Sequence, residues 1–135
     1  MADRLIETIE LPNGLTLELH DQSRPLAGDR WLVSLQARIE VPLRQEFFAS
    51  HQNGEHAYEE MASLYGSHLV FVQEKVRHFV DARDVEKVLA GLVQRVKGNM
   101  LAYLGNAKFP SRYLLKEYAD LQKRKSWSTD KSENQ

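Results

Sequence analysis

The sequence predicts an α+β fold, in which an antiparallel sheet of about four strands is followed by two C-terminal helices packed on one of its faces. In the first half of the chain apolar residues alternate with polar ones, as they do in a strand with one buried face. In the second half they recur every three to four residues, as in an amphipathic helix. A length of 135 residues with 42% hydrophobic content matches one core. We expect a single domain over residues 1–127 and a disordered polar tail over residues 128–135.

A turn at residues 11–15 predicts the first hairpin. Pro12 suits the first central position of a turn, and Asn13-Gly14 supplies the left-handed conformations that close two antiparallel strands. Apolar residues alternate on both sides of this turn, with Glu7 as the exception: Leu5, Ile9 and Leu11 before it, and Leu15, Leu17 and Leu19 after it. The turn and the alternation together predict two paired strands.

The clearest strand follows a longer connection over residues 21–30. Alternate residues of this strand are apolar and would face the core: Trp31, Val33, Leu35, Ala37, Ile39 and Val41. The residues between them are mostly polar, which is typical of an antiparallel sheet that is covered on one face only. Pro42 ends the strand or bends it.

The remaining elements are a short middle helix, a further strand and the two C-terminal helices. Helical spacing before Gly66 predicts the middle helix within residues 44–67. Residues 69–80 fit either a strand or a helix, and their density of β-branched residues favours a strand. Capping aspartates at 81 and 84 precede a long amphipathic helix that Gly105 ends. A second helix begins at Pro110.

Charge and composition limit the possible functions. Residues 1–64 carry 5 Lys and Arg against 11 Asp and Glu, whereas residues 65–135 carry 13 against 8. The absence of cysteine excludes disulfides, thiolate metal sites and cysteine nucleophiles. The charged start and the lack of a long apolar run predict a cytoplasmic protein without a membrane span.

Histidines and carboxylates cluster in residues 51–60. If a helix begins near His56, then His56 and Glu60 lie one turn apart on the same face, where they could share a divalent cation. Adding His51 gives a candidate metal site, although the spacing matches none of the zinc-hydrolase motifs. An exposed polar loop before a helix explains the same residues.

The connection before the long strand is a candidate ligand-binding loop, because loops on rigid sheets often carry function. Its candidate residues are charged or aromatic: Asp21, Arg24, Asp29, Arg30 and Trp31. The alternative is a hairpin loop held by Asp–Arg pairs and the ring of Trp31.

Two glycines mark the outer side of the long helix. Gly91 and Gly98 lie opposite its apolar stripe, and with Ala102 they predict a groove of small residues that another helix could approach closely. Tolerated glycines at exposed positions are the alternative.

The chain shows no catalytic constellation and no cofactor motif. We therefore expect a non-catalytic interaction or regulatory module that forms a homo-oligomer or binds a protein partner. A small-molecule or divalent-metal-binding protein, with or without enzymatic activity, is the main alternative. Nucleic-acid binding through the basic residues 106–127 is less favoured, because the whole chain is not basic.

Overall fold

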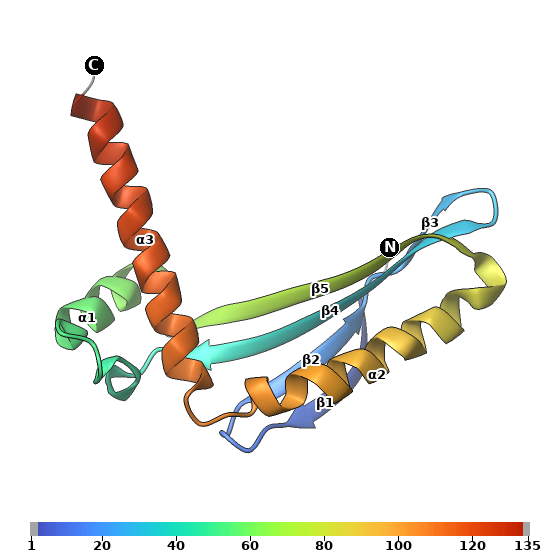
Figure 1. Cartoon of the computed structure of the whole chain (residues 1–135), viewed down its shortest axis with the longest axis horizontal. Helices are drawn as coiled ribbons and strands as arrows, with labels where there is room; N and C mark the ends of the chain where they lie inside the picture. The colour runs from blue at the N-terminus through green and yellow to red at the C-terminus, as the bar shows by residue number, and fades with distance from the viewer. Residues whose placement is uncertain (1–2, 134–135) are drawn as a thin grey trace. The chain divides into compact units, whose positions relative to one another are not determined.

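The computed structural model describes the backbone of residues 3–133 and the side chains of residues 3–127. It has the predicted α+β fold, an antiparallel sheet with three helices (Figure 1). The strands are β1 (Arg4–Glu10), β2 (Thr16–Asp21), β3 (Arg24–Ala27), β4 (Arg30–Pro42) and β5 (His68–Asp81). The helices are α1 (Gly54–Tyr65), α2 (Val85–Leu104) and α3 (Phe109–Glu133), with short 3₁₀ helices η1 (Gln45–Phe48) and η2 (Ala82–Asp84).

The chain divides into two compact units. The first comprises Met1–Glu40 and Val70–Ala107, and the second comprises Val41–Leu69 and Lys108–Gln135. The expectation of one domain over residues 1–127 stays a prediction. The tail expected over residues 128–135 also stays a prediction. The α3 backbone continues to Glu133, but the side chains of this segment and its last two residues lie outside the described part.

Strand β4 pairs with three other strands. It pairs antiparallel with β2, from Leu17 opposite Ile39 to Asp21 opposite Leu35, and β3 continues the same register with Arg24 opposite Leu32. Because β3 prolongs β2 along one edge of β4, β5 takes the other edge. The sheet is therefore four strands wide, as predicted, although residues 21–30 contain a short strand that the sequence did not reveal.

The two faces of the sheet differ as the alternation predicted. On β4 the apolar residues at alternate positions are fully or almost fully buried: Val33, Leu35, Ala37, Ile39 and Val41. Helix α2 lies along the sheet in the first unit (Figure 1), and its Lys97 Nζ lies 2.7 Å from Glu7 Oε1. Glu7, the polar exception on the inner face of β1, thus has a cationic partner on the covering helix.

Leu5 corrects one detail of the predicted hairpin. A register irregularity between Leu5 and Glu7 shifts the strand by one residue, so that Leu5 lies opposite His20 and is 52% exposed. A shift of one residue moves a side chain to the other face of a sheet. Alternation alone therefore placed Leu5 on the wrong face.

Hydrogen bonds and close packing join the first hairpin to the end of α2 in the first unit. The Asn13 side-chain amide donates to the carbonyl oxygens of Leu104 and Asn106, at 2.8 and 3.0 Å. A Cβ built on Gly105 would lie 2.7 Å from Pro12 Cδ, so only glycine fits this close contact without a shift. The turn thus binds carbonyl groups at the C-terminal end of α2 that the helix itself leaves without donors.

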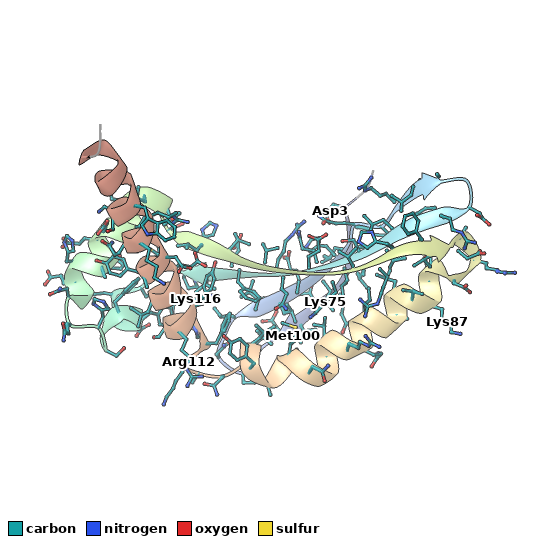
Figure 2. All side chains as sticks on the ribbon, turned by 45° about the horizontal axis from the view of Figure 1, so that its top comes forward. Asp3, Lys75, Lys87, Met100, Arg112 and Lys116 are labelled. Atoms are coloured by element: carbon teal, nitrogen blue, oxygen red, sulfur yellow. The ribbon has the colours of Figure 1, made fainter. Side chains whose placement is uncertain are left out.

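Helix α2 buries most of its predicted stripe. Val85, Leu89, Leu92, Val93 and Val96 are buried. Tyr103, which helical spacing also places on the predicted stripe, is 52% exposed instead of buried. Lys87 points away from the sheet on the opposite side of the helix (Figure 2). No helix in the described part of the chain is long and apolar enough to cross a membrane.

The second unit is built from η1, α1 and α3. Its fully buried side chains include Phe48 of η1, Met61 of α1, and Phe109 and Leu114 of α3. Helix α1 confirms the predicted middle helix, and β5 resolves residues 69–80 as a strand. At the start of α1 the chain passes close to η1, because a Cβ on Gly54 would meet the Phe48 carbonyl oxygen at 2.2 Å.

This contact predicts that Gly54→Ala destabilises the second unit. The added methyl group would collide with backbone, which gives way less easily than the end of a flexible side chain, so a loss of about 1–3 kcal/mol is expected. Urea unfolding followed by circular dichroism measures the change. Gly98→Ala is the matched control, since nothing lies within 4 Å of a Cβ at that position. Equal stability of the two variants would contradict the contact.

Candidate functional site

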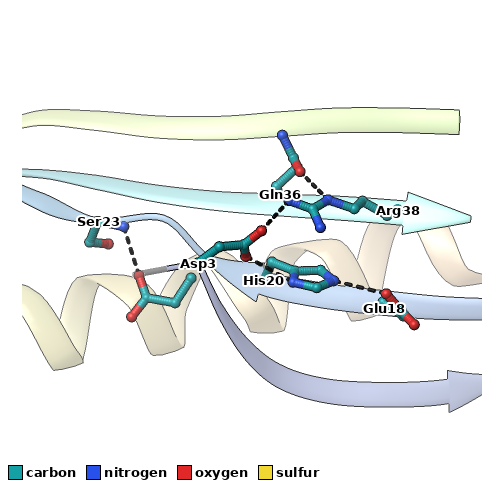
Figure 3. Close-up of polar contacts among 7 residues, drawn as sticks. Asp3, Glu18, His20, Ser23, Gln36 and Arg38 are labelled. Atoms are coloured by element: carbon teal, nitrogen blue, oxygen red, sulfur yellow. Dashed lines mark hydrogen bonds and ion pairs between the residues drawn. The ribbon is translucent and has the colours of Figure 1, made fainter. Parts of the chain in front are cut away.

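Polar side chains converge on the face of the sheet opposite the buried one. They come from the start of the chain, β2 and β4, and we call them the His20 cluster: Asp3, Glu18, His20, Gln36 and Arg38 (Figure 3). Strand register builds the cluster, because Glu18 lies opposite Arg38 and His20 opposite Gln36. Cross-strand neighbours on one face are close enough to interact directly.

His20 is held from both sides of its ring. Its Nδ1 lies 2.9 Å from Asp3 Oδ1, and its Nε2 lies 2.9 Å from Glu18 Oε1. The side chain is buried, with 9% of the residue exposed. Both ring nitrogens are therefore engaged by carboxylate oxygens from two different segments of the chain.

This geometry does not suit general-base catalysis. A catalytic histidine needs one ring nitrogen oriented by a carboxylate and the other available to a substrate or nucleophile. In His20 the second nitrogen faces Glu18. The nearby serine hydroxyls are also engaged, since Ser23 Oγ accepts from the Ser34 amide and Ser34 Oγ donates to Glu74. The hydrogen bonds of the cluster instead fasten Asp3 to β2 and β4 of the sheet.

Arg38 of β4 also binds Asp3. Its guanidinium donates to Asp3 Oδ2 and to Gln36 Oε1. The hydrogen bond from Arg38 lowers the pKa of Asp3 despite partial desolvation, and the nearby charges of Arg38 and His20 lower this pKa further. Asp3 is therefore the residue that joins the cation on β4 to the imidazole on β2.

The lowered pKa predicts how stability depends on pH. The unfolded chain protonates Asp3 more readily than the folded chain, so the contribution of this carboxylate is present above the unfolded pKa of about 3.9. That contribution is lost as the pH falls through the folded pKa. We expect Asp3→Asn to be less stable than the wild type at pH 7, with the difference closing toward pH 3. Urea unfolding across this range measures it, and a difference that does not change with pH would contradict the prediction.

The residues of the predicted ligand loop make two separate sets of contacts. Asp21 binds Arg4 at 2.9 Å and accepts from the Ser23 amide. Burial raises the pKa of Asp21, but the hydrogen bonds from Ser23 and Arg4 outweigh it and the pKa is lowered. At the other end, Arg30 lies 3.8 Å from Asp29 and 3.6 Å from Asp81.

Four of the five residues of that loop lie on the β3–β4 hairpin: Arg24, Asp29, Arg30 and Trp31. Trp31 is half-buried opposite Pro25, and Arg24 is exposed. The Asp–Arg pairs therefore match the alternative interpretation, in which they hold a hairpin. Ligand binding by this loop stays a prediction.

Two of the three predicted metal ligands meet in the second unit. His56 Nε2 lies 3.5 Å from Glu60 Oε1, one turn apart on α1 as expected. Glu60 also accepts from Lys125 and from Gln122 of α3. The hydrogen bond from Lys125 lowers the pKa of Glu60 against partial desolvation. His56, Glu60 and Lys125 border a groove of about 600 Å³ between α1 and α3, which Leu64 and Leu121 also line.

His51 makes other contacts. Its Nδ1 accepts from the Asn53 amide at 3.0 Å, and its ring packs edge-on against Tyr118 with centroids 5.4 Å apart. Among the described residues no group of three or more histidine and carboxylate side chains is placed to hold a metal ion. The metal hypothesis is thus reduced to the His56–Glu60 pair, and it stays a prediction.

The predicted groove of small residues lies on the exposed side of α2. Gly91, Gly98 and Ala102 are all exposed. Nothing in the described part of the chain lies within 4 Å of a Cβ built on either glycine. The groove is therefore open in a single copy of the chain.

An open groove predicts that Gly91→Ala/Gly98→Ala stabilises α2. Each substitution removes the conformational freedom of glycine in the unfolded state and gains about 1 kcal/mol, so the pair should gain about 1–2 kcal/mol. Thermal unfolding measures the gain, and light scattering reports the mass. If a second copy instead packs closely on this groove, the double variant will show a smaller mass at equal concentration.

No known protein family, no curated protein and no solved structure matches this chain. Sequence reasoning missed the His20 cluster, although Glu18 and His20 on one strand, and Gln36 and Arg38 on another, each share a polar face. Only the register, which the sequence does not reveal, places these pairs opposite each other.

Proposed function

We propose that this chain is a non-catalytic interaction module that associates with itself, and that the outer edge of β5 pairs with β5 of a second copy. The observation that carries the proposal is the position of β5. Among the described strands it pairs only with β4, so this 14-residue strand forms an edge of the sheet. Long edge strands present unpaired backbone groups that readily add another strand.

Exposed apolar side chains on the open face support pairing at this edge. Val72 of β5 is 49% exposed, and Val70 is 44% exposed. The neighbouring strand β4 shows polar residues on the same face, including Gln36 and Arg38. The apolar surface is thus concentrated along the edge strand. Such a distribution favours edge-to-edge pairing over stacking of a second sheet on the whole face.

Phe79 near the end of β5 gives independent support. Its φ of 57° lies in the left-handed region, where a bulky L side chain is strained. The side chain is 72% exposed, so packing within one copy does not explain the strain. Strained residues are enriched at binding surfaces. A second copy in antiparallel pairing would contact the same residues on both sides of a two-fold axis.

The non-catalytic part of the proposal is supported by the His20 cluster. Both ring nitrogens of the buried histidine lie within hydrogen-bond distance of carboxylates, and the nearby Ser23 and Ser34 hydroxyls are hydrogen-bonded. Neither ring nitrogen is thus available to a substrate.

A binding role for the groove between α1 and α3 is a second candidate, favoured by its volume of about 600 Å³ and by the two leucines that line it.

A charge placed at Val72 should prevent self-association. Val72→Lys puts an ammonium group where two β5 strands would meet, which is a device that natural edge strands use against pairing. We expect the wild type to have twice the mass of one chain in light scattering, and Val72→Lys to have the mass of one chain at equal concentration.

Val72→Thr is the matched control, because threonine keeps the β-branched shape and the strand propensity without a charge. It should keep the mass of the wild type. Circular dichroism verifies that both variants are folded. A wild type that has the mass of a single chain at concentrations near 100 μM, or equal masses for wild type and Val72→Lys, would refute pairing at this edge.

A further inference from the structure

One side of α3 carries an exposed row of basic residues. The row follows helical spacing and ends in a tryptophan: Arg112, Lys116, Ala119, Lys123 and Trp127, which we call the α3 stripe. Every member is exposed, and Trp127 is 64% exposed. Arg112 and Lys116 are labelled at the start of this row in Figure 2. At 1.5 Å per residue the stripe is about 22 Å long.

Three cations of the α3 stripe lack an ion-pair partner among the side chains of residues 3–127. No carboxylate in this part of the chain lies within ion-pair distance of Arg112, Lys116 or Lys123. The acidic residues of the same helical segment, Glu117 and Asp120, are half-buried beside the stripe. Lys125 differs, because it binds Glu60. The stripe therefore presents three cations that no described carboxylate pairs with.

We propose that the α3 stripe binds single-stranded nucleic acid, with Arg112, Lys116 and Lys123 contacting phosphates and Trp127 stacking on a base. A row of cations with an exposed aromatic ring is the arrangement that binds single strands without sequence preference. Unpaired bases are needed because a base inside a duplex does not present its face to a side chain. The inference is independent of β5 pairing, since the stripe belongs to the second unit and the exposed part of β5 to the first.

The packing of α3 argues against an anionic membrane as the partner. A helix that lies in a membrane surface inserts an apolar face into the lipid. The apolar side of α3 is already used within the second unit, where Leu114, Tyr118 and Leu121 are buried. Apart from the small Ala119, only Trp127 offers an apolar side chain on the exposed row. Charge is therefore left as the main attraction, together with one ring suited to stacking.

The test is fluorescence anisotropy of a labelled oligothymidylate titrated with the full chain at several salt concentrations. Three phosphate contacts predict a slope of log affinity against log salt of about −2 for a single strand. Between about 50 and 200 mM salt the affinity should therefore fall about 20-fold.

Two double variants that each remove two cations distinguish binding by the α3 stripe from attraction by net charge. Lys116→Gln/Lys123→Gln removes two stripe cations and should reduce the slope to about −0.7, with weaker binding at low salt. Lys87→Gln/Arg95→Gln removes two exposed cations from α2 and should leave slope and affinity unchanged. Circular dichroism monitors folding of both. Equal weakening by both pairs would overturn the proposal, because it would show attraction by net charge alone.

The fluorescence of Trp127 distinguishes base stacking from a purely electrostatic attraction, which would not quench it. In a Trp31→Phe background Trp127 is the only tryptophan, and base stacking should quench its fluorescence when the oligonucleotide is added. Trp127→Ala should weaken binding about tenfold without changing the salt slope. Three results would overturn the proposal: no binding at about 50 mM salt, no quenching on binding, or binding to phosphatidylserine vesicles that is tighter than binding to the oligonucleotide.

Discussion

The alternation of side chains along β4 is the constraint on which the first unit depends. Its apolar residues, from Val33 to Ile39, are buried on one face, and this requires α2 to cover that face. The residues between them must then point to the other face, where Gln36 and Arg38 meet partners from β2. Pairing on both edges of β4 leaves β5 as an edge strand. The covered face, the His20 cluster and the exposed edge all follow from the period of two along this strand.

Elements with a strong local pattern could be predicted from the sequence. Three elements combine a periodic run with a residue that ends it: the hairpin around Pro12–Gly14, the strand that begins near Trp31 and the long helix before Gly105. Strand β3 could not be predicted in this way, because it has no apolar alternation and all four of its residues are exposed. The position of Leu5 was mispredicted for a related reason, since a bulge depends on the pairing with β2.

Site residues were predictable only where the contacts are local. His56 and Glu60 are four residues apart on one helix, so helical geometry alone brings them together. His20 meets Asp3 seventeen residues away, and Arg38 meets Asp3 thirty-five residues away, through strand register and not through sequence spacing. The sequence showed that residues 106–127 are rich in basic residues. Their arrangement on one exposed row became clear only when the apolar side of α3 was found buried.

The interleaved composition of the two units has a consequence for the order of folding. The first unit is completed by Val70–Ala107, so the chain must bring β5 and α2 back across an excursion of about thirty residues before that core can close. Non-local pairing of this kind slows folding, because the entropy of closing the intervening loop is lost before the contacts form. During synthesis the hairpin of β1 and β2 would emerge first, with its apolar face uncovered until α2 has left the ribosome. The bonds from Asn13 to the end of α2 would then be among the last to form.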